Sequence, residues 1–252
     1  MMPMGLHALA HFAPDGRRRA LQLCALVAIL LLQACAAVPY PDPRDPMESF
    51  NRGVFTFNDK LDRAVLKPVA TVYKDATPQW ARKGVTNFFN NLEDVWSVVN
   101  NTLQLRGQDA ADSFGRVVIN TTLGLAGTMD VASGVGLERH TANFGLTLGR
   151  WGVKPGPYIV LPFFGPSSLR EVAALPIDYN GNLVNSIGDT DARNGLWVLS
   201  VIDTRAQFLQ AGQVVDQAAL DPYSFIREGY LQRRRNQVYD GNPPEEDYTE
   251  SP

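Results

Sequence analysis

The stretch TPQWARKGVTNFFNNLEDVWSVVNNTLQL, residues 77–105, decides the fold class, because its apolar side chains recur every three or four positions. This spacing places them on one stripe of an α-helix. Thr77 and Pro78 are typical of a helix start, as the N-cap and the first helical residue. The stripe contains Trp80, Phe88, Leu92, Val95 with Trp96, Val99 and Leu103. The segment therefore predicts one long amphipathic helix.

The helical period continues on both sides of this stretch. Residues 47–65 carry a similar stripe, and Pro68 should end or kink that helix. Further helices are predicted over about 109–123 and 191–211. The last helix begins at Asp221-Pro222 and ends on Arg233, Arg234 and Arg235, which suit the negative end of the helix dipole. The inward positions of the 191–211 helix are Leu196, Leu199, Ile202, Ala206 and Leu209. Segments with a period of two are scarce, so the sequence predicts a mainly α protein.

Two stretches interrupt the helical pattern. Residues 123–150 contain glycines at 124, 127, 134, 136, 145 and 149. We interpret them as a short helical hairpin with glycine hinges at each end, because glycine accommodates large φ/ψ changes. Residues 151–168 combine glycine and proline with aromatic and aliphatic residues, which favours an extended, rigid segment. From the residues alone, both stretches could equally be surface loops.

The N-terminus has the pattern of a targeting segment. Arg17–Arg19 form a positive region, and the apolar run that follows, residues 20–32, is too short to span a bilayer. It ends in Leu32-Gln33-Ala34-Cys35, which matches a bacterial lipobox, although Gln33 is less usual at its place. We therefore predict a signal peptide over residues 1–34 and a covalently attached diacylglycerol and N-acyl chain on Cys35. The alternative is an ordinary secretory peptide with an incidental cysteine.

Cleavage before Cys35 changes the composition of the chain. It removes Cys24, three arginines, one aspartate and two of the three histidines, so the net charge moves from −3 to −5. This acidic balance does not fit a nucleic-acid-binding protein. Residues 35–46 are a proline-rich tether, 47–240 a single domain, and 241–252 a disordered acidic tail. Ala36, in place of the aspartate that often retains lipoproteins in the inner membrane, favours the outer membrane.

Residues for catalysis are scarce in the mature chain. It would have no free thiol, and His140 alone cannot build a metal site with nitrogen and sulfur ligands. The sequence contains neither a phosphate-binding P-loop nor a Gly-x-Ser-x-Gly elbow. We expect no catalytic residue, no metal and no cofactor, and His140 to be a polar residue of the hairpin. A site built from carboxylates alone stays open.

The aromatic side chains of the stripes have two interpretations. A buried core is the default for residues such as Phe57 and Trp80. A lipid-anchored protein also holds its body near acyl chains, where amphipathic helices can lie within the membrane interface.

The mature sequence contains a series of short motifs: Asp45-Pro46-Met47-Glu48-Ser49-Phe50-Asn51-Arg52, Phe57-Asn58, Lys67-Pro68-Val69-Ala70, Asn87-Phe88, Asn91-Leu92-Glu93, Arg116, Asn120-Thr121-Thr122-Leu123-Gly124, Asp130, Phe144-Gly145, Thr147-Leu148-Gly149, Gly152-Val153, Gly156-Pro157-Tyr158, Leu161-Pro162-Phe163, Gly165, Thr204-Arg205-Ala206-Gln207, Asp221-Pro222-Tyr223, Arg227-Glu228 and Tyr230. Through these residues it resembles the VacJ/MlaA family of outer-membrane lipoproteins. The motifs cover nearly the whole mature chain.

This resemblance implies a ring-like, single domain of amphipathic helices around a central channel, in the periplasm-facing leaflet of the outer membrane. It implies that phospholipids misplaced in the outer leaflet pass through the channel to a soluble periplasmic carrier, which delivers them to an inner-membrane ABC transporter complex. It also implies association with a trimeric porin.

The resemblance implies roles for individual residues as well. Gly124, Gly127, Gly145 and Gly149 would be the hinges of a gating hairpin, and Val54 and Phe144 would form its contact. The porin-facing residues would be Asp203, Thr204, Arg205 and Gln207. Two other functions stay open: a structural lipoprotein that scaffolds porins or envelope partners, and a lipid-modifying enzyme that uses carboxylates.

Overall fold

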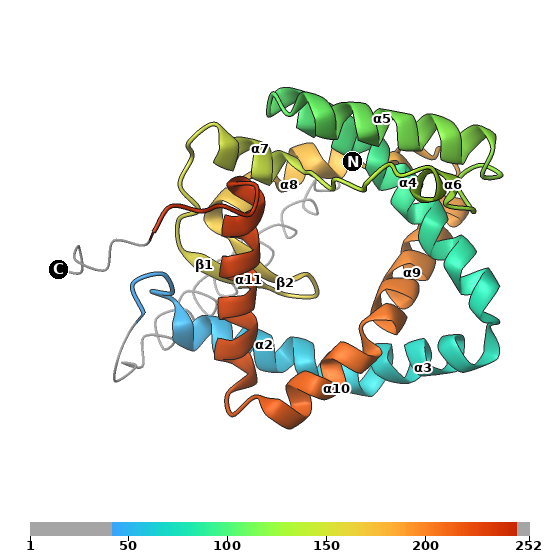
Figure 1. The fold of residues 1–252 in the computed structure, drawn as a ribbon. Coiled ribbons are helices and arrows are strands. Elements are labelled where there is room, and N and C mark those ends of the chain that lie inside the picture. Colours follow the sequence, from blue (N-terminus) through green and yellow to red (C-terminus); the bar gives the residue numbers. More distant parts are fainter. Residues whose placement is uncertain (1–41, 246–252) are drawn as a thin grey trace, which may run out of the picture.

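The computed structural model describes residues 42–245, so Cys35 and the end of the acidic tail lie outside the described residues. Its elements are α2 (Glu48–Leu61), a π-helical stretch η1 (Asp62–Leu66), α3 (Lys67–Ala76), α4 (Gln79–Leu103), α5 (Gly107–Thr122), α6 (Val131–Gly134), α7 (Phe144–Arg150), β1 (Tyr158–Leu161), β2 (Gly165–Ser168), α8 (Leu169–Gly181), the 3₁₀ turn η2 (Leu183–Ser186), α9 (Thr190–Gln207), α10 (Leu209–Ala218) and α11 (Pro222–Val238). The prediction of a mainly α protein is confirmed. Figure 1 shows the long helices following one another around a ring-like outline.

Several helix boundaries differ from those predicted. Pro68 neither ends nor breaks the first helix, but lies in the first turn of α3. The preceding π-helical stretch η1 joins α2 to α3 without a loop. The N-cap of α4 is Pro78, not Thr77, and no side chain caps this end. The predicted 191–211 helix is broken at Phe208, which separates α9 from α10.

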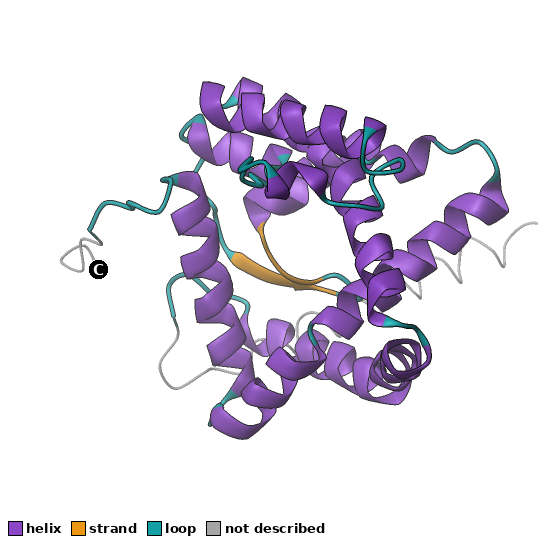
Figure 2. Ribbon diagram, turned by 45° about the vertical axis from the view of Figure 1, so that its right-hand side comes forward, coloured by secondary structure: helices purple, strands orange, loops and turns teal. Residues whose placement is uncertain are grey.

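Other predictions agree with the structure. The 109–123 helix is α5, and α11 begins as predicted, with the Asp221 carboxylate accepting a hydrogen bond from the Tyr223 N–H. The extended segment 151–168 contains an antiparallel hairpin in which Tyr158 pairs with Ser168. Figure 2 shows this hairpin enclosed among the helices. The predicted helical hairpin is reduced to α6, a single turn, and α7, which are separated by residues 135–143.

Helices α4 and α5 form an antiparallel pair. The turn between them is tight, and Leu105 adopts a positive φ of 58° in it. Asn91 Nδ2 donates to Thr121 Oγ1 over 3.0 Å at one end of the pair, and Asn101 Nδ2 donates to Ser113 Oγ over 3.2 Å near the other. Polar side chains therefore join the two helices along their length.

The buried face of this pair is polar throughout. In α4 and the residue that follows it, the buried side chains are Asn91, Asp94, Ser97, Asn100, Asn101 and Gln104. In α5 they are Ser113, Arg116 and Asn120. The spacing of three or four residues puts each set on one helical stripe. The stripe that each helix buries against the other is therefore hydrophilic.

Several members of the apolar stripes are exposed, and the expectation of a buried aromatic core is wrong for them. Trp80 is 79 % exposed and Phe57 is 47 % exposed. Buried apolar side chains in the described part of the chain form small clusters, such as Tyr158, Val160 and Tyr223. Within residues 42–245, no helix combines the length and the apolar character needed to cross a bilayer. Large apolar side chains are therefore exposed, whereas the packed interface between α4 and α5 is polar.

Asn51 joins α2 to the β-hairpin. It is fully buried, and its Nδ2 donates to Asp45 Oδ1 over 2.7 Å and to the Tyr158 carbonyl over 3.0 Å. Its Oδ1 accepts from the Val160 N–H over 2.9 Å. Asp45 also pairs with Arg227 of α11 over 3.1 Å. The Asn51 side chain therefore satisfies the Asp45 carboxylate, the Tyr158 carbonyl and the Val160 N–H. It links α2 to β1 and to the segment that precedes α2.

Asn51→Ala should lower the free energy of unfolding by roughly 2–3 kcal/mol, because it leaves buried donors and acceptors without partners. Denaturant unfolding of the detergent-solubilised protein measures this change. Asn180→Ala is the matched control, since Asn180 is exposed and bonds only within its own helix, to the Pro176 carbonyl. Equal losses in the two variants would contradict the role of Asn51.

Candidate functional site

A hollow of about 380 Å³ lies between α4, α8 and α9. We call it the α4–α9 hollow. Its wall is amphipathic, with aromatic and aliphatic side chains next to carboxylates and amides. The apolar part comprises Phe89, Leu92, Trp96, Leu175, Val184 and Trp197, and the polar part includes Asn90, Glu93, Asn143, Asp178 and Asp203. A wall of this kind can contact both parts of an amphipathic molecule.

Asp178 of α8 holds two elements of this wall together. Its Oδ1 accepts from Trp96 Nε1 over 2.8 Å and from the Phe144 N–H, at the start of α7, over 2.7 Å. Gly181 allows the approach of α8 to α4, because a Cβ there would lie 2.3 Å from the Trp96 ring. The indole is therefore fixed in position by one carboxylate and one glycine.

Asp203 of α9 is buried in the same wall and accepts hydrogen bonds from two other elements. Tyr73 Oη donates to it over 2.9 Å, and Thr86 Oγ1 over 2.8 Å. Burial and this hydrogen bond to Asp203 raise the pKa of Tyr73 to about 12, so the phenol stays protonated. Thr86, Asp203 and Gln207 also line an adjoining hollow of about 280 Å³, whose cations are Arg82 and Lys83. The amphipathic α4–α9 hollow therefore borders a smaller hollow that is lined by two cationic side chains.

A buried ion network fixes residues 130–139 on α4 and α5. Asp94 lies between Arg139 Nε, at 2.7 Å, and Arg116 Nε, at 3.3 Å. Burial raises the pKa of Asp94, although both guanidinium groups oppose the shift. Arg116 also binds Ser133 Oγ and the Leu137 carbonyl over 2.9 Å, and Asp130 over 3.0 Å. One arginine of α5 therefore holds the segment that contains α6.

The four glycines predicted as hinges occupy sites of close contact. A Cβ on Gly124 would lie 2.2 Å from the Met129 carbonyl oxygen, and one on Gly145 would lie 2.1 Å from Glu171 Oε2. Gly127 adopts a φ of +85° and packs on Asn91. Gly149 packs against Val238 and Arg170. Packing accounts for glycine at these positions, and their role as hinges stays a prediction.

The structure does not bring Val54 and Phe144, the predicted contact of the hairpin, together. Val54 packs on the Tyr158–Val160–Tyr223 cluster, whereas the Phe144 ring contacts Trp151, with ring centroids 6.0 Å apart. Arg205 forms an ion pair with Asp62 over 2.6 Å. Asp203 is buried, as described above, while Thr204 and Gln207 are exposed. Of the residues predicted to face a porin, only the latter two present an exposed side chain.

The sequence reasoning missed the α4–α9 hollow and the Asp94 network. A signal was present, because small polar residues follow the same period of three or four as the apolar ones: Asn87, Asn91, Asp94, Ser97, Asn101 and Gln104. Among residues 42–245, no group of three or more histidine, cysteine or acidic side chains is placed to hold a metal ion. His140 lies 3.4 Å from Asp112 and 3.7 Å from Asp109.

Comparisons with known proteins agree on one family. The family model of the MlaA lipoprotein matches residues 43–237. Proteins from Shigella flexneri and Escherichia coli (strain K12), each described as "Intermembrane phospholipid transport system lipoprotein MlaA", are 37 % identical over 226 residues, which is 84 % of this chain and 87 % of each relative. A solved structure described as "Structural basis for maintenance of bacterial outer membrane lipid asymmetry" superposes with a TM-score of 0.68 at 37 % identity, over 79 % of this chain and 99 % of that one.

Proposed function

The chain belongs to the MlaA lipoprotein family, and on that premise we propose that it is an envelope lipoprotein that takes part in phospholipid transport between the two membranes. It removes phospholipids mislocalised in the outer leaflet of the outer membrane. They pass along an amphipathic channel within the ring and are handed to a periplasmic carrier for retrograde transport. Transfer of a lipid breaks no covalent bond, so this role needs no nucleophile and no cofactor.

The observation that carries the proposal is the inverted distribution of polarity. Helices α4 and α5 bury polar stripes, while large apolar side chains such as Trp80 and Phe164 are 79 % and 77 % exposed. Transfer of one such side chain from water to an apolar environment contributes roughly 1.5–3 kcal/mol. A lipid surround for these exposed side chains is therefore favourable, and the polar side chains that line the α4–α9 hollow offer contacts for a head group.

The amphipathic path would include the α4–α9 hollow. Phe89 and Trp96 offer apolar contacts there, and Arg82 and Lys83 of the adjoining hollow offer positive charge for a phosphate. The ring would lie in the periplasm-facing leaflet, next to a trimeric porin. The carrier would pass its lipid to an inner-membrane ABC transporter complex.

A strain that lacks the protein tests this function. It should accumulate phospholipid in the outer leaflet of its outer membrane, and the wild-type chain should restore the normal level, as measured by labelling of exposed amine head groups. The scaffold alternative instead predicts altered porin assembly with a normal lipid distribution. That second result would refute the transport proposal.

Cys35→Ala separates the anchor from the ring. The acyl chains on Cys35 would contribute roughly 0.8 kcal/mol of membrane affinity for each buried CH₂. We expect the variant to be depleted from outer-membrane fractions while its purified ring still binds phospholipid. Membrane fractionation and lipid extraction measure the two effects. A variant that reaches the outer membrane at the wild-type level would show that Cys35 is not the anchor.

A further inference from the structure

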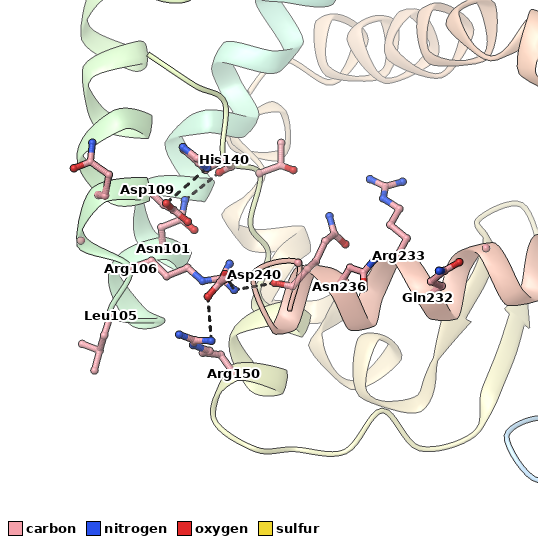
Figure 3. Close-up of a pocket in the computed structure, with 16 residues that line it drawn as sticks. Asn101, Leu105, Arg106, Asp109, His140, Arg150, Gln232, Arg233, Asn236 and Asp240 are labelled. Carbon is pink, nitrogen blue, oxygen red and sulfur yellow. Dashed lines mark hydrogen bonds and ion pairs between the residues drawn. The ribbon is translucent and has the colours of Figure 1, made fainter. Parts of the chain in front are cut away.

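A second and larger hollow, of about 1020 Å³, lies where the start of α5, the end of α7 and α11 meet. Figure 3 shows the side chains that line it, and we call it the α5–α11 hollow. It shares no lining residue with the α4–α9 hollow. Nothing in the proposed function assigns it a role. Its volume is at the upper end of the range of ligand sites in proteins.

The wall of this hollow has one positive charge in excess. It contains Arg106, Arg150 and Arg233 against Asp109 and Asp240, with histidine neutral. Asp240 is shared between Arg106 and Arg150, at 3.2 Å from the latter. The Arg233 side chain forms no ion pair or hydrogen bond with any other residue of the 42–245 range, and Figure 3 draws none to it. The Arg233 guanidinium is therefore available to an anion.

The start of α5 adds to this positive character. The helix has 16 residues, and no side chain caps its N-terminus. Gly107 and Gln108, in its first turn, line the hollow. The N–H groups at the start of a helix, together with its dipole, favour a phosphate or another anion.

A buried acceptor in the same wall lacks a partner. Asn101 lines the hollow and is 1 % exposed. Its Nδ2 donates to Ser113 Oγ and to the His140 carbonyl, whereas its Oδ1 has no hydrogen-bond partner. Buried polar atoms without a partner are rare in native structures. The Asn101 Oδ1 atom is closed to the hollow, so this side chain forms part of the wall and does not contact a ligand.

The rim of the hollow is apolar. Leu105 belongs to the lining and is 92 % exposed. Trp151 follows the lining residue Arg150, is 55 % exposed and donates its Nε1–H to the Leu103 carbonyl over 3.0 Å. A polar wall with an apolar rim suits a ligand that carries a charged head and a hydrocarbon tail.

We propose that the α5–α11 hollow binds the phosphate-bearing head group of a zwitterionic phospholipid, with Arg233 as the residue that contacts the phosphate. The Asp109 carboxylate, which also lines the hollow, supplies an acceptor for the ammonium group. This inference rests on the proposed transport function. It adds a second binding site for the lipid, on the side of the ring formed by α5 and α11.

Binding of labelled phosphatidylethanolamine to the purified full-length protein in detergent tests the inference. Diacylglycerol with the same acyl chains serves as the probe without a phosphate. The wild-type protein should prefer the phospholipid, and Arg233→Gln should weaken phospholipid binding roughly tenfold, because one charge-assisted hydrogen bond is lost. Diacylglycerol binding should be unchanged. Arg233→Lys should retain most of the preference, because it keeps the charge.

Lys60→Gln is the matched control for charge. Lys60 is exposed on α2 and does not line the hollow, so its removal should leave both affinities unchanged. Arg233→Gln should not alter the unfolding midpoint, since Arg233 has no partner to lose.

The outcomes separate the inference from the function on which it rests. If the wild-type protein binds phospholipid and Arg233→Gln binds it equally well, only the head-group inference is overturned. If the wild-type protein binds no phospholipid, the transport proposal fails with it. Glycerophosphoethanolamine and inorganic phosphate are tested as competitors. Displacement of the lipid by either at an equal concentration would make the hollow a site for soluble phosphates and would overturn the inference.

Discussion

Arg116→Met should lower the free energy of unfolding by about 3–5 kcal/mol, the largest stability change that we expect from a single substitution. The Arg116 side chain is 3 % exposed and binds Asp94, Asp130, Ser133 and the Leu137 carbonyl. Methionine has a comparable volume but offers no donor. Asp94 would remain buried with Arg139 as its only cation. Denaturant unfolding in detergent measures the loss.

Arg63→Met is the matched control for this substitution. Arg63 also forms two ion pairs, with Asp59 at 2.9 Å and Asp216 at 3.1 Å, but its side chain is 55 % exposed. Exposed pairs contribute little to stability, because water and salt screen them. A loss from Arg116→Met no larger than that from Arg63→Met would show that the polar interface of α4 and α5 does not stabilise the ring.

A disulfide between positions 84 and 128 should abolish lipid clearance. A Cβ built on Gly84 lies 3.9 Å from the Thr128 Cβ, a separation that suits a disulfide. Gly84→Cys with Thr128→Cys would fix the segment containing Gly124 and Gly127 to α4. If this segment must move for a lipid to pass, the oxidised double variant should accumulate outer-leaflet phospholipid to the level of a strain that lacks the protein.

The design contains its own controls. The periplasm favours disulfide formation, and addition of a reductant should restore clearance. Each single cysteine variant should clear lipid at the wild-type rate, because neither can form the bond within one chain. Clearance at the wild-type rate by the oxidised double variant would refute the gating role of residues 123–149.

Much of the helical architecture could be predicted from the sequence. The period of three to four residues located α4, α5 and the first helix, and Asp221-Pro222 located the start of α11. Local chemistry determines such features, so they can be identified without knowledge of the tertiary structure. The break at Phe208 and the continuous passage through Pro68 depend on packing, and the sequence did not reveal them.

The orientation of the helices could not be predicted in the same way. A period shows which residues share a stripe, but it does not show which stripe faces inward. In water the apolar stripe is buried, whereas a lipid surround favours the opposite arrangement, as Trp80 and Asn101 illustrate here. The reason for glycine at the predicted hinge positions could not be predicted either. Gly145, for example, is compatible both with a hinge and with the close contact to Glu171.

Transfer of phospholipid by the purified mature chain tests the central claim most directly. The lipoprotein is inserted into liposomes that contain isotopically labelled phosphatidylethanolamine, and a soluble lipid-binding acceptor is added. Mass spectrometry of the recovered acceptor measures both the amount and the chemical form of the lipid. We predict that labelled, chemically unaltered phospholipid reaches the acceptor faster than from liposomes without the protein. Transfer no faster than from protein-free liposomes, or recovery of a cleaved or modified lipid, would contradict this account.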